Sequence, residues 1–249
     1  LTSPEAFRGG SIWGIIVNIH DALKATGFAL LVLFFVMGVV KTTTNFSELK
    51  RPEHAVRLFL RFAIAKAVVT YGMDLMLAVF RIAQGVVSSI AGSLGSASGM
   101  LAALPAEVEA AIAQASFWES IPLWIVTLLG SLLITILSFI IIMTMYGRYF
   151  SLYMYAAIAP IPLAAFAGES TAQIGVQFLK SYAGVCLQGA IIVLACVIFT
   201  AFAAAPPAVT GRGVVQMVWN YIAELVFNLL VLVGAVKLSE RLCKEMMGL

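Results

Sequence analysis

Charged residues are scarce in this sequence. Fifteen Lys and Arg and twelve Asp and Glu make up only 11% of the 249 residues, whereas soluble domains carry roughly 25%. Hydrophobic residues make up 62%, and the mean hydropathy is +1.03. These values exclude an ordinary soluble domain and predict an all-α, polytopic membrane helix bundle. The net charge of +3 is too small and too scattered to indicate nucleic-acid binding as the main activity.

Cysteine, histidine and catalytic motifs are also rare. Cys186 and Cys196 are about 15 Å apart along a helix, so neither a disulfide nor a metal pair fits them, and Cys243 is left over. The sequence contains no Gly-x-x-x-x-Gly-Lys-Ser/Thr loop, no His-Glu-x-x-His site and no Gly-x-Ser-x-Gly elbow. We therefore expect no enzymatic activity, no cofactor and no metal. Because the first residue is Leu, the sequence neither shows nor excludes a cleaved signal peptide, and it does not show the native start.

Long apolar runs define the predicted spans. They cover residues 22–40, 58–88, 121–146, 183–205 and 214–236, and residues 237–249 are predicted to form an amphipathic tail. Residues 1–21 are expected to form an interfacial helix, because Asn18, His20 and Asp21 interrupt its apolar patch. We expect His20 and Asp21 to form a solvated pair at headgroup level.

A proline-containing segment decides the topology. No charged residue occurs between Arg148 and Glu169, a length that would cross a bilayer, but Pro160 and Pro162 interrupt helical hydrogen bonding near its middle. Residues 149–167 are therefore predicted to be re-entrant, with the break at these prolines. Backbone of this kind is tolerated only where protein or water covers it, so the segment should lie inside a bundle or an oligomer.

The distribution of Lys and Arg favours this topology over a sixth span. With the basic loop Lys41 to Arg61 inside and Lys66 left out as a buried charge, a full crossing places seven basic residues on each side. A re-entrant segment places ten inside and four outside. This bias predicts five spans in the inner membrane, with the amino terminus outside and the carboxyl terminus in the cytoplasm.

Two polar patterns mark the spans as more than lipid anchors. Lys66 and Asp74 belong to a polar face of span 58–88 that covers an arc of about 80°. A charge at such depth costs about 2.5–3.5 kcal/mol, so it should face protein or water. In the last span, polar side chains recur at every fourth position as a ladder: Gln216, Asn220, Glu224 and Asn228. We predict that both sets line a channel or contact other subunits.

The stretch from Arg148 to Gln188 carries a family resemblance. It has an aromatic-rich beginning, then Ala159-Pro160-Ile161-Pro162, a turn at Gly168, and Phe178-Leu179-Lys180-Ser181-Tyr182 leading into a span. This pattern, spread over the carboxyl-terminal two thirds, resembles the TrbL family, the polytopic inner-membrane subunits of type IV secretion and conjugation machines. The amino-terminal fifty residues add little to the resemblance.

The resemblance implies a translocation-channel or platform subunit. Such a protein would form homo-oligomers, assemble with other membrane subunits and with cytoplasmic ATPases, and help to move a DNA–protein complex or assemble a pilus. Nucleic acid would then be cargo only.

Other function classes stay open at this stage. A small-solute or ion transporter would also use Lys66, Asp74 and Glu224 together with a broken helix, but no internal repeat relates two halves of the chain. A structural scaffold, in which the polar patterns only join subunits, is close to the channel hypothesis. An intramembrane enzyme is disfavoured, because no nucleophile and base can be placed at matching depths.

Overall fold

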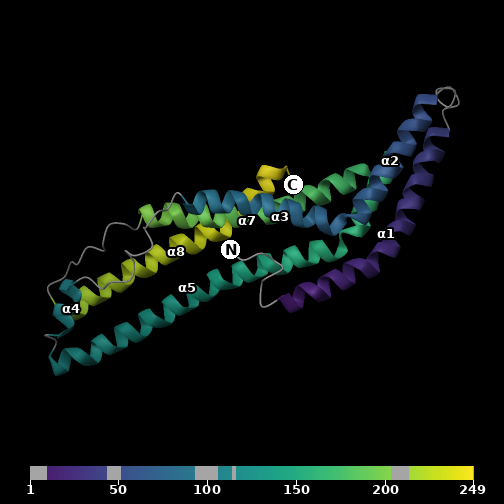
Figure 1. Cartoon of the computed structure of the whole chain (residues 1–249). Helices are drawn as coiled ribbons and strands as arrows, with labels where there is room; N and C mark the ends of the chain where they lie inside the picture. Colours follow the sequence, from purple (N-terminus) through teal and green to yellow (C-terminus); the bar gives the residue numbers. More distant parts are fainter. Residues whose placement is uncertain (1–9, 44–51, 93–105, 114–115, 203–212, 249) are drawn as a thin grey trace. The chain divides into compact units, whose positions relative to one another are not determined.

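The computed structural model describes residues 10–43, 52–92, 106–113, 116–202 and 213–248. Every regular element in these ranges is a helix (Figure 1). Within these described ranges, five helices are long and apolar enough to cross a membrane: Ser11–Lys41, Gly72–Gly92, Phe117–Ile158, Ala172–Ala201 and Val214–Met247. The predicted fold class, an all-α polytopic membrane bundle with five spans, is therefore confirmed.

Helix α1, Ser11–Thr43, runs without interruption through the polar positions Asn18, His20 and Asp21. From residue 11 onward, the segment expected to be a separate interfacial helix is thus continuous with span 22–40. The expected solvated pair is wrong for His20, which is completely buried. Asp21 is exposed and pairs instead with Lys24, its carboxylate oxygen lying 2.8 Å from the Lys24 ammonium nitrogen.

The predicted span 58–88 falls on two helices, α2 (Pro52–Thr70) and α3 (Gly72–Gly92). Tyr71 lies between them. Its backbone N–H donates to the Ala67 carbonyl at 2.9 Å and its carbonyl accepts from the Leu75 N–H at 3.0 Å. The chain therefore keeps its hydrogen bonding through this joint. Of these two helices, α3 is apolar enough to be a candidate span and α2 is not.

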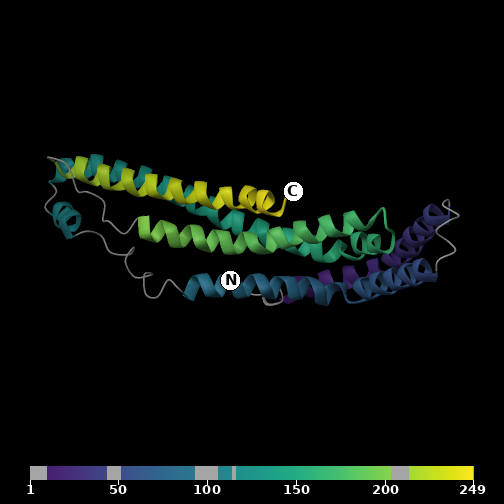
Figure 2. The same cartoon turned by 90° about the horizontal axis from the view of Figure 1, so that it is seen from above.

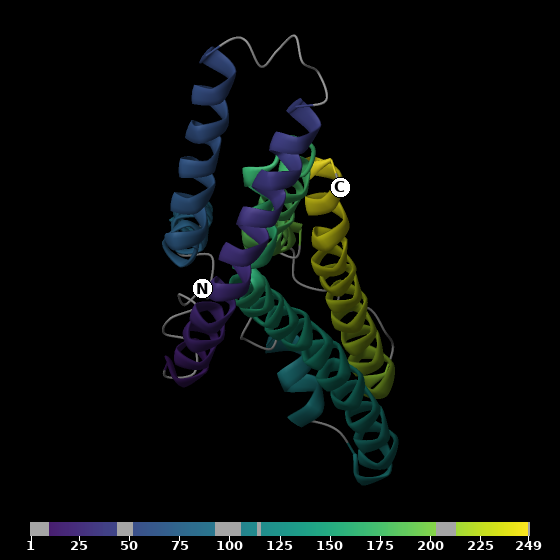
Figure 3. The ribbon, with the colours of Figure 1, turned by 90° about the vertical axis from the view of Figure 1, so that its right-hand side faces the viewer.

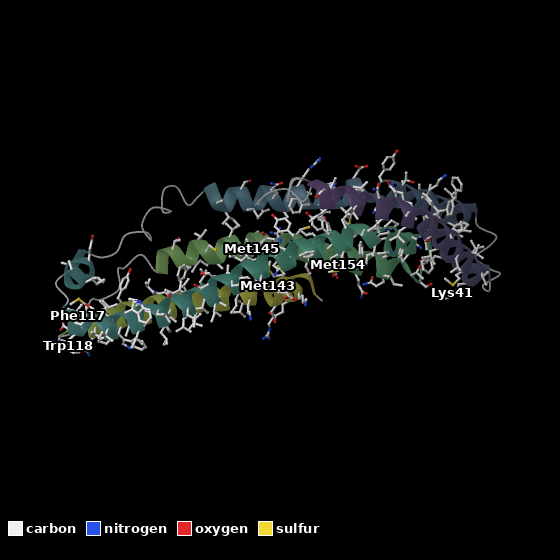
Figure 4. All side chains as sticks on the ribbon, turned by 90° about the horizontal axis from the view of Figure 1, so that it is seen from below. Lys41, Phe117, Trp118, Met143, Met145 and Met154 are labelled. Atoms are coloured by element: carbon white, nitrogen blue, oxygen red, sulfur yellow. The ribbon has the colours of Figure 1, made fainter. Side chains whose placement is uncertain are left out.

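After α4 (Ala106–Ala113), helix α5 (Phe117–Ile158) has 42 residues. At 1.5 Å per residue it is about 63 Å long, roughly twice the hydrocarbon thickness of a bilayer. Figure 4 labels four of its strongly exposed apolar side chains, Phe117, Trp118, Met143 and Met154. Because α5 is this long, its final turns extend beyond what one span requires.

The rest of the chain returns from the end of α5. Short helices α6 (Pro160–Ala164) and η3 (Ala165–Ala167) precede α7 (Ala172–Phe202). Helix α8 (Val214–Met247) contains the predicted last span and most of the predicted tail 237–249.

The chain divides into two compact units, and several helices contribute to both. The first comprises Leu1–Val86, Arg148–Gly189 and Leu242–Leu249. Its core gathers buried side chains of α1, α2, α3, α5, α6 and α7, among them Leu31, Val69, Met76, Leu152 and Leu163. The end of α1 and the start of α2 lie at the same end of this unit (Figure 3).

The second unit comprises Val87–Gly147 and Ala190–Arg241. Its small core joins α4, α5 and α8 through Val108, Leu123 and Val218. Helices α5 and α8 lie side by side in this unit (Figure 2), and Gly130 of α5 leaves the room that the Ile222 side chain occupies. The cysteines are free, as expected, and Cys186 and Cys243 are buried.

Candidate functional site

The candidate site is the hairpin tip, residues 159–171, which joins α5 to α7 in the first unit. Pro160 stands at the start of α6, but the Leu163 N–H still donates to the Ala159 carbonyl at 3.1 Å, so the chain stays helical past the proline. It leaves helical geometry at Gly168, whose φ of −99° and ψ of 142° are extended. The chain therefore turns at Gly168 to Thr171, where the sequence pattern also has a turn, and Pro160, one of the two predicted break residues, stands at the boundary between α5 and α6.

Thr171 closes this turn. Its hydroxyl donates to the Ala165 carbonyl at 2.8 Å and lies 3.3 Å from the Gly168 carbonyl oxygen, while the Ala172 N–H donates to that same Gly168 carbonyl at 3.0 Å. These bonds satisfy the Ala165 and Gly168 carbonyls at η3, and the same bonds hold the first residues of α7 in place. The tip is consequently held by its own hydrogen bonds as well as by its surroundings.

Helix α1 approaches the tip backbone to backbone. A Cβ atom at Gly27 would lie 2.8 Å from the Pro160 carbonyl oxygen, and one at Gly168 would lie 2.8 Å from the Phe34 carbonyl oxygen. Such distances are open only to glycine. One turn beyond Phe34, Gly38 also faces Gly168, since a Cβ there would lie 3.6 Å from its Cα.

The tip is covered by helices of its own chain. Pro160, Leu163 and Ala164 are buried, Pro162 is half-buried, and α1 and α2 both contact α6 and η3. Of the two shelters expected for this segment, a bundle or an oligomer, the described residues supply the first. At its edge, the exposed Glu169 carboxylate lies 3.6 Å from the Arg61 guanidinium of α2.

His20 joins α1 to the end of α5. Its Nδ1 lies 2.7 Å from the Ala156 carbonyl oxygen. A carbonyl can only accept, so Nδ1 carries the proton. The other ring nitrogen, Nε2, is buried and has no hydrogen-bond partner among the described residues. It lies against Gly72, the first residue of α3, where a Cβ would be 3.5 Å away.

Arg148 is the second buried polar group of the hairpin, with 4% of its surface exposed. It donates from Nε to the Val185 carbonyl and from Nη2 to the Cys186 carbonyl, both at 3.2 Å. Gly189, one turn further along α7, leaves the space that the guanidinium fills, because a Cβ there would collide with it. These contacts place Arg148 of α5 level with residues 185–186 of α7.

Arg148 therefore carries a buried positive charge that its surroundings only partly compensate. Its Nη1 has no hydrogen-bond partner in the described ranges, and neither ion pair observed there, Asp21–Lys24 or Arg61–Glu169, involves Arg148. The Tyr149 ring contributes a cation–π contact, with the guanidinium carbon 5.8 Å from the ring centroid. An arginine in such a place is costly unless each of its bonds is kept.

The polar residues predicted in span 58–88 are not buried within the chain. Lys66 on α2 and Asp74 on α3 are both exposed. Lys66 was treated as the buried charge in the topology count, whereas the structure exposes Lys66 and buries Arg148.

The α8 ladder belongs to the second unit. Gln216 is exposed, and Asn220, Glu224 and Asn228 are half-buried. Ile222 contacts α5 at Gly130, and at 100° per residue Glu224 lies about 200° around the helix from Ile222. Glu224 therefore faces away from α5.

Sequence reasoning missed the roles of His20 and Arg148, although each had a signal. A proline at position 160 removes the N–H that would bond the carbonyl at 156, so a buried donor is required somewhere else in the chain. A histidine in an otherwise apolar helix can supply such a donor. For Arg148 the signal was weaker, because its partners are carbonyls and a glycine from a distant helix.

The fold and the hairpin define a class: a multi-pass α-helical membrane protein whose proline-containing tip is enclosed by its own helices. The chain matches, over residues 1–160, the family described as TrbL/VirB6 plasmid conjugal transfer like protein, and it belongs to that family. The predicted family is confirmed, but its match includes the amino-terminal fifty residues and ends at the hairpin tip, whereas the resemblance was placed in the carboxyl-terminal two thirds. Searches of the curated proteins and of the solved structures found no match.

Membership establishes the broad role. The protein is a multi-pass inner-membrane component of a conjugal transfer or type IV secretion system, and it associates with other components of that system. The family is one of conjugation subunits rather than of enzymes.

Proposed function

We propose that this chain is a channel or platform subunit of a type IV secretion machine. It helps to move DNA–protein cargo across the inner membrane or to assemble a pilus. Its partners are further copies of itself, other membrane subunits of the machine, and the cytoplasmic ATPases that supply energy. Its amino terminus lies outside and its carboxyl terminus in the cytoplasm.

One observation carries this proposal beyond family membership. Polar side chains of helices α3 and α8, both apolar enough to span, are not enclosed within the chain: Asp74 and Gln216 are exposed, and Glu224 is only half-buried and faces away from α5. Contact with lipid is energetically costly for such polar groups, whereas other subunits or an aqueous path would supply hydrogen-bond partners. A subunit surface of this kind is what a channel or platform component needs.

The hairpin supports the proposed orientation. Arg148 of α5 bonds to the carbonyls of residues 185–186 of α7, so these positions lie at the same height along the two helices. The residues between them form a hairpin that extends from this height and comes back to it on the same side. Lys180 falls within this excursion, as the five-span topology with a cytoplasmic carboxyl terminus requires.

The ladder can be tested by cysteine substitution in a variant that lacks Cys186, Cys196 and Cys243. Cysteines introduced singly at the four ladder positions, 216, 220, 224 and 228, are expected to react with a charged, water-soluble thiol reagent or to cross-link between copies. The reason is that these positions face water or another subunit. The measurement is the labelled or cross-linked fraction in intact membranes.

Two matched positions control this experiment. Trp219→Cys lies beside Asn220 at the same depth on an exposed apolar surface and should react slowly if lipid covers it. Val218→Cys is buried in the core of the second unit and should also stay unlabelled. Uniform inertness of all four ladder positions would argue against a lining or subunit-contact role.

The role in transfer is tested by complementation. A conjugative system whose own gene for this protein is deleted should regain transfer with the wild-type chain, and Glu224→Leu should transfer less because it removes the ladder's charge. Plasmid transfer frequency is the readout, and the amount of each protein in the membrane is the control. If the purified protein alone accumulated a small solute in liposomes, the transporter alternative would replace this proposal.

A further inference from the structure

Pro160 creates a specific need at the end of α5. A residue at position 160 with a backbone N–H would donate it to the carbonyl of Ala156, four residues earlier. Proline has no N–H, so this carbonyl loses its helical donor. The whole Ala156 residue is only 1% exposed, so water has little access to take the donor's place.

The missing donor comes from another helix. His20 of α1, 136 residues earlier in the chain, places Nδ1 2.7 Å from the Ala156 carbonyl oxygen, a short hydrogen bond. The ring is completely buried, so the bond is made away from water. Because Ala156 precedes the proline by one helical turn, the bond fixes α1 at the point where α5 gives way to the hairpin tip.

We propose that His20 is a latch: its imidazole N–H replaces the backbone N–H that Pro160 lacks, and so ties α1 to the hairpin tip. The same imidazole ring lies against Gly72, the first residue of α3, so the joint between α2 and α3 also packs against His20. His20 is a positioning residue, and this role does not depend on the proposed transport function. Where the bond is intact, Gly27 and Pro160 stay in backbone contact.

A double-mutant cycle between positions 20 and 160 isolates this bond. His20→Leu removes the donor and leaves the Ala156 carbonyl unsatisfied. The expected result is a fall of roughly 2–12 °C in the thermal unfolding midpoint of the purified full-length protein in detergent. In a Pro160→Ala background the backbone N–H is present again, and the same substitution should lower the midpoint by less than half as much.

Rescue and a matched control distinguish a latch from general packing. His20→Asn keeps an N–H donor near the Nδ1 position and should retain most of the midpoint. Tyr182→Phe removes another buried bond between helices, from the Tyr182 hydroxyl to the Met76 carbonyl at 2.9 Å. Met76 lies inside α3 and keeps its helical donor, so this control should cost the same in both backgrounds.

Equal losses for His20→Leu with Pro160 and with Ala at position 160 would overturn the proposal. If His20→Leu does not accumulate as a folded protein, the yield of monodisperse protein becomes the readout. Recovery of that yield in the double variant would then support the latch. Failure of the double variant while Pro160→Ala alone accumulates would contradict it.

Discussion

Replacing Gly189 by alanine is expected to destabilise the protein by about 2–4 kcal/mol. The new Cβ would occupy the space of the Arg148 guanidinium, which would lose one or both of its bonds to the Val185 and Cys186 carbonyls. Hydrogen bonds to a charged group contribute about 1.5–3 kcal/mol each, and a buried charge that loses a partner is costly. The measurement is the thermal unfolding midpoint of the detergent-solubilised protein, together with its level in the membrane.

Two further variants give this prediction its control. Gly147→Ala, next to Arg148 on α5, adds a Cβ with nothing within 4 Å and should be neutral or stabilising by up to about 1 kcal/mol. In an Arg148→Met background the guanidinium is gone, so Gly189→Ala should cost much less than in the wild type. If Gly189→Ala were as stable as the wild type, the Arg148 guanidinium would not pack against Gly189 in the folded protein.

Replacing Gly27 by alanine is expected to cost about 1–3 kcal/mol, although alanine favours a helix more than glycine does. The added Cβ would lie 2.8 Å from the Pro160 carbonyl oxygen and 3.2 Å from its carbonyl carbon. Both are backbone atoms, so α1 and α6 must move apart and no side-chain rotation can relieve the contact. The unfolding midpoint should fall, and a cysteine placed at the buried Ala164 in a cysteine-free variant should become more reactive to thiol reagents.

Gly14→Ala is the matched control on the same helix. Nothing lies within 4 Å of the Cβ that it adds, so it should keep or slightly raise the midpoint. If Gly14→Ala and Gly27→Ala behaved alike, the close approach between α1 and the hairpin tip would not exist in the folded protein.

Helix packing, rather than hydropathy, explains where sequence reasoning fell short. The polar residues Asn18, His20 and Asp21 argued for a break before residue 22, yet α1 begins at Ser11. Burial of His20 against a carbonyl and pairing of Asp21 with Lys24 make these positions compatible with one continuous helix. The Lys24 partner of Asp21 lies three residues along the same helix, but the partner of His20 cannot be found from the periodicity of α1, because it is a backbone atom 136 residues away.

The hairpin tip shows the same difference between what local sequence pattern indicates and what helix packing decides. The prolines led us to predict a re-entrant segment over residues 149–167, with a break in helical hydrogen bonding at Pro160 and Pro162. A proline at the first position of a helix is compatible with helical geometry, since the N–H that it lacks is not needed within α6. The chain turns at Gly168, where the Phe34 backbone leaves no room for a side chain.

The sequence alone determined that this protein is a helical membrane protein with five spans, because long runs of apolar side chains with few charges are stable only in lipid. It also indicated the family, through the pattern around Ala159 to Pro162 and the aromatic residues before it, and the family match over residues 1–160 confirmed it. Only the tertiary structure decided which polar groups are buried. His20 and Arg148 donate to carbonyls of distant helices, and a contact of that kind depends on how the helices pack rather than on any local spacing of residues.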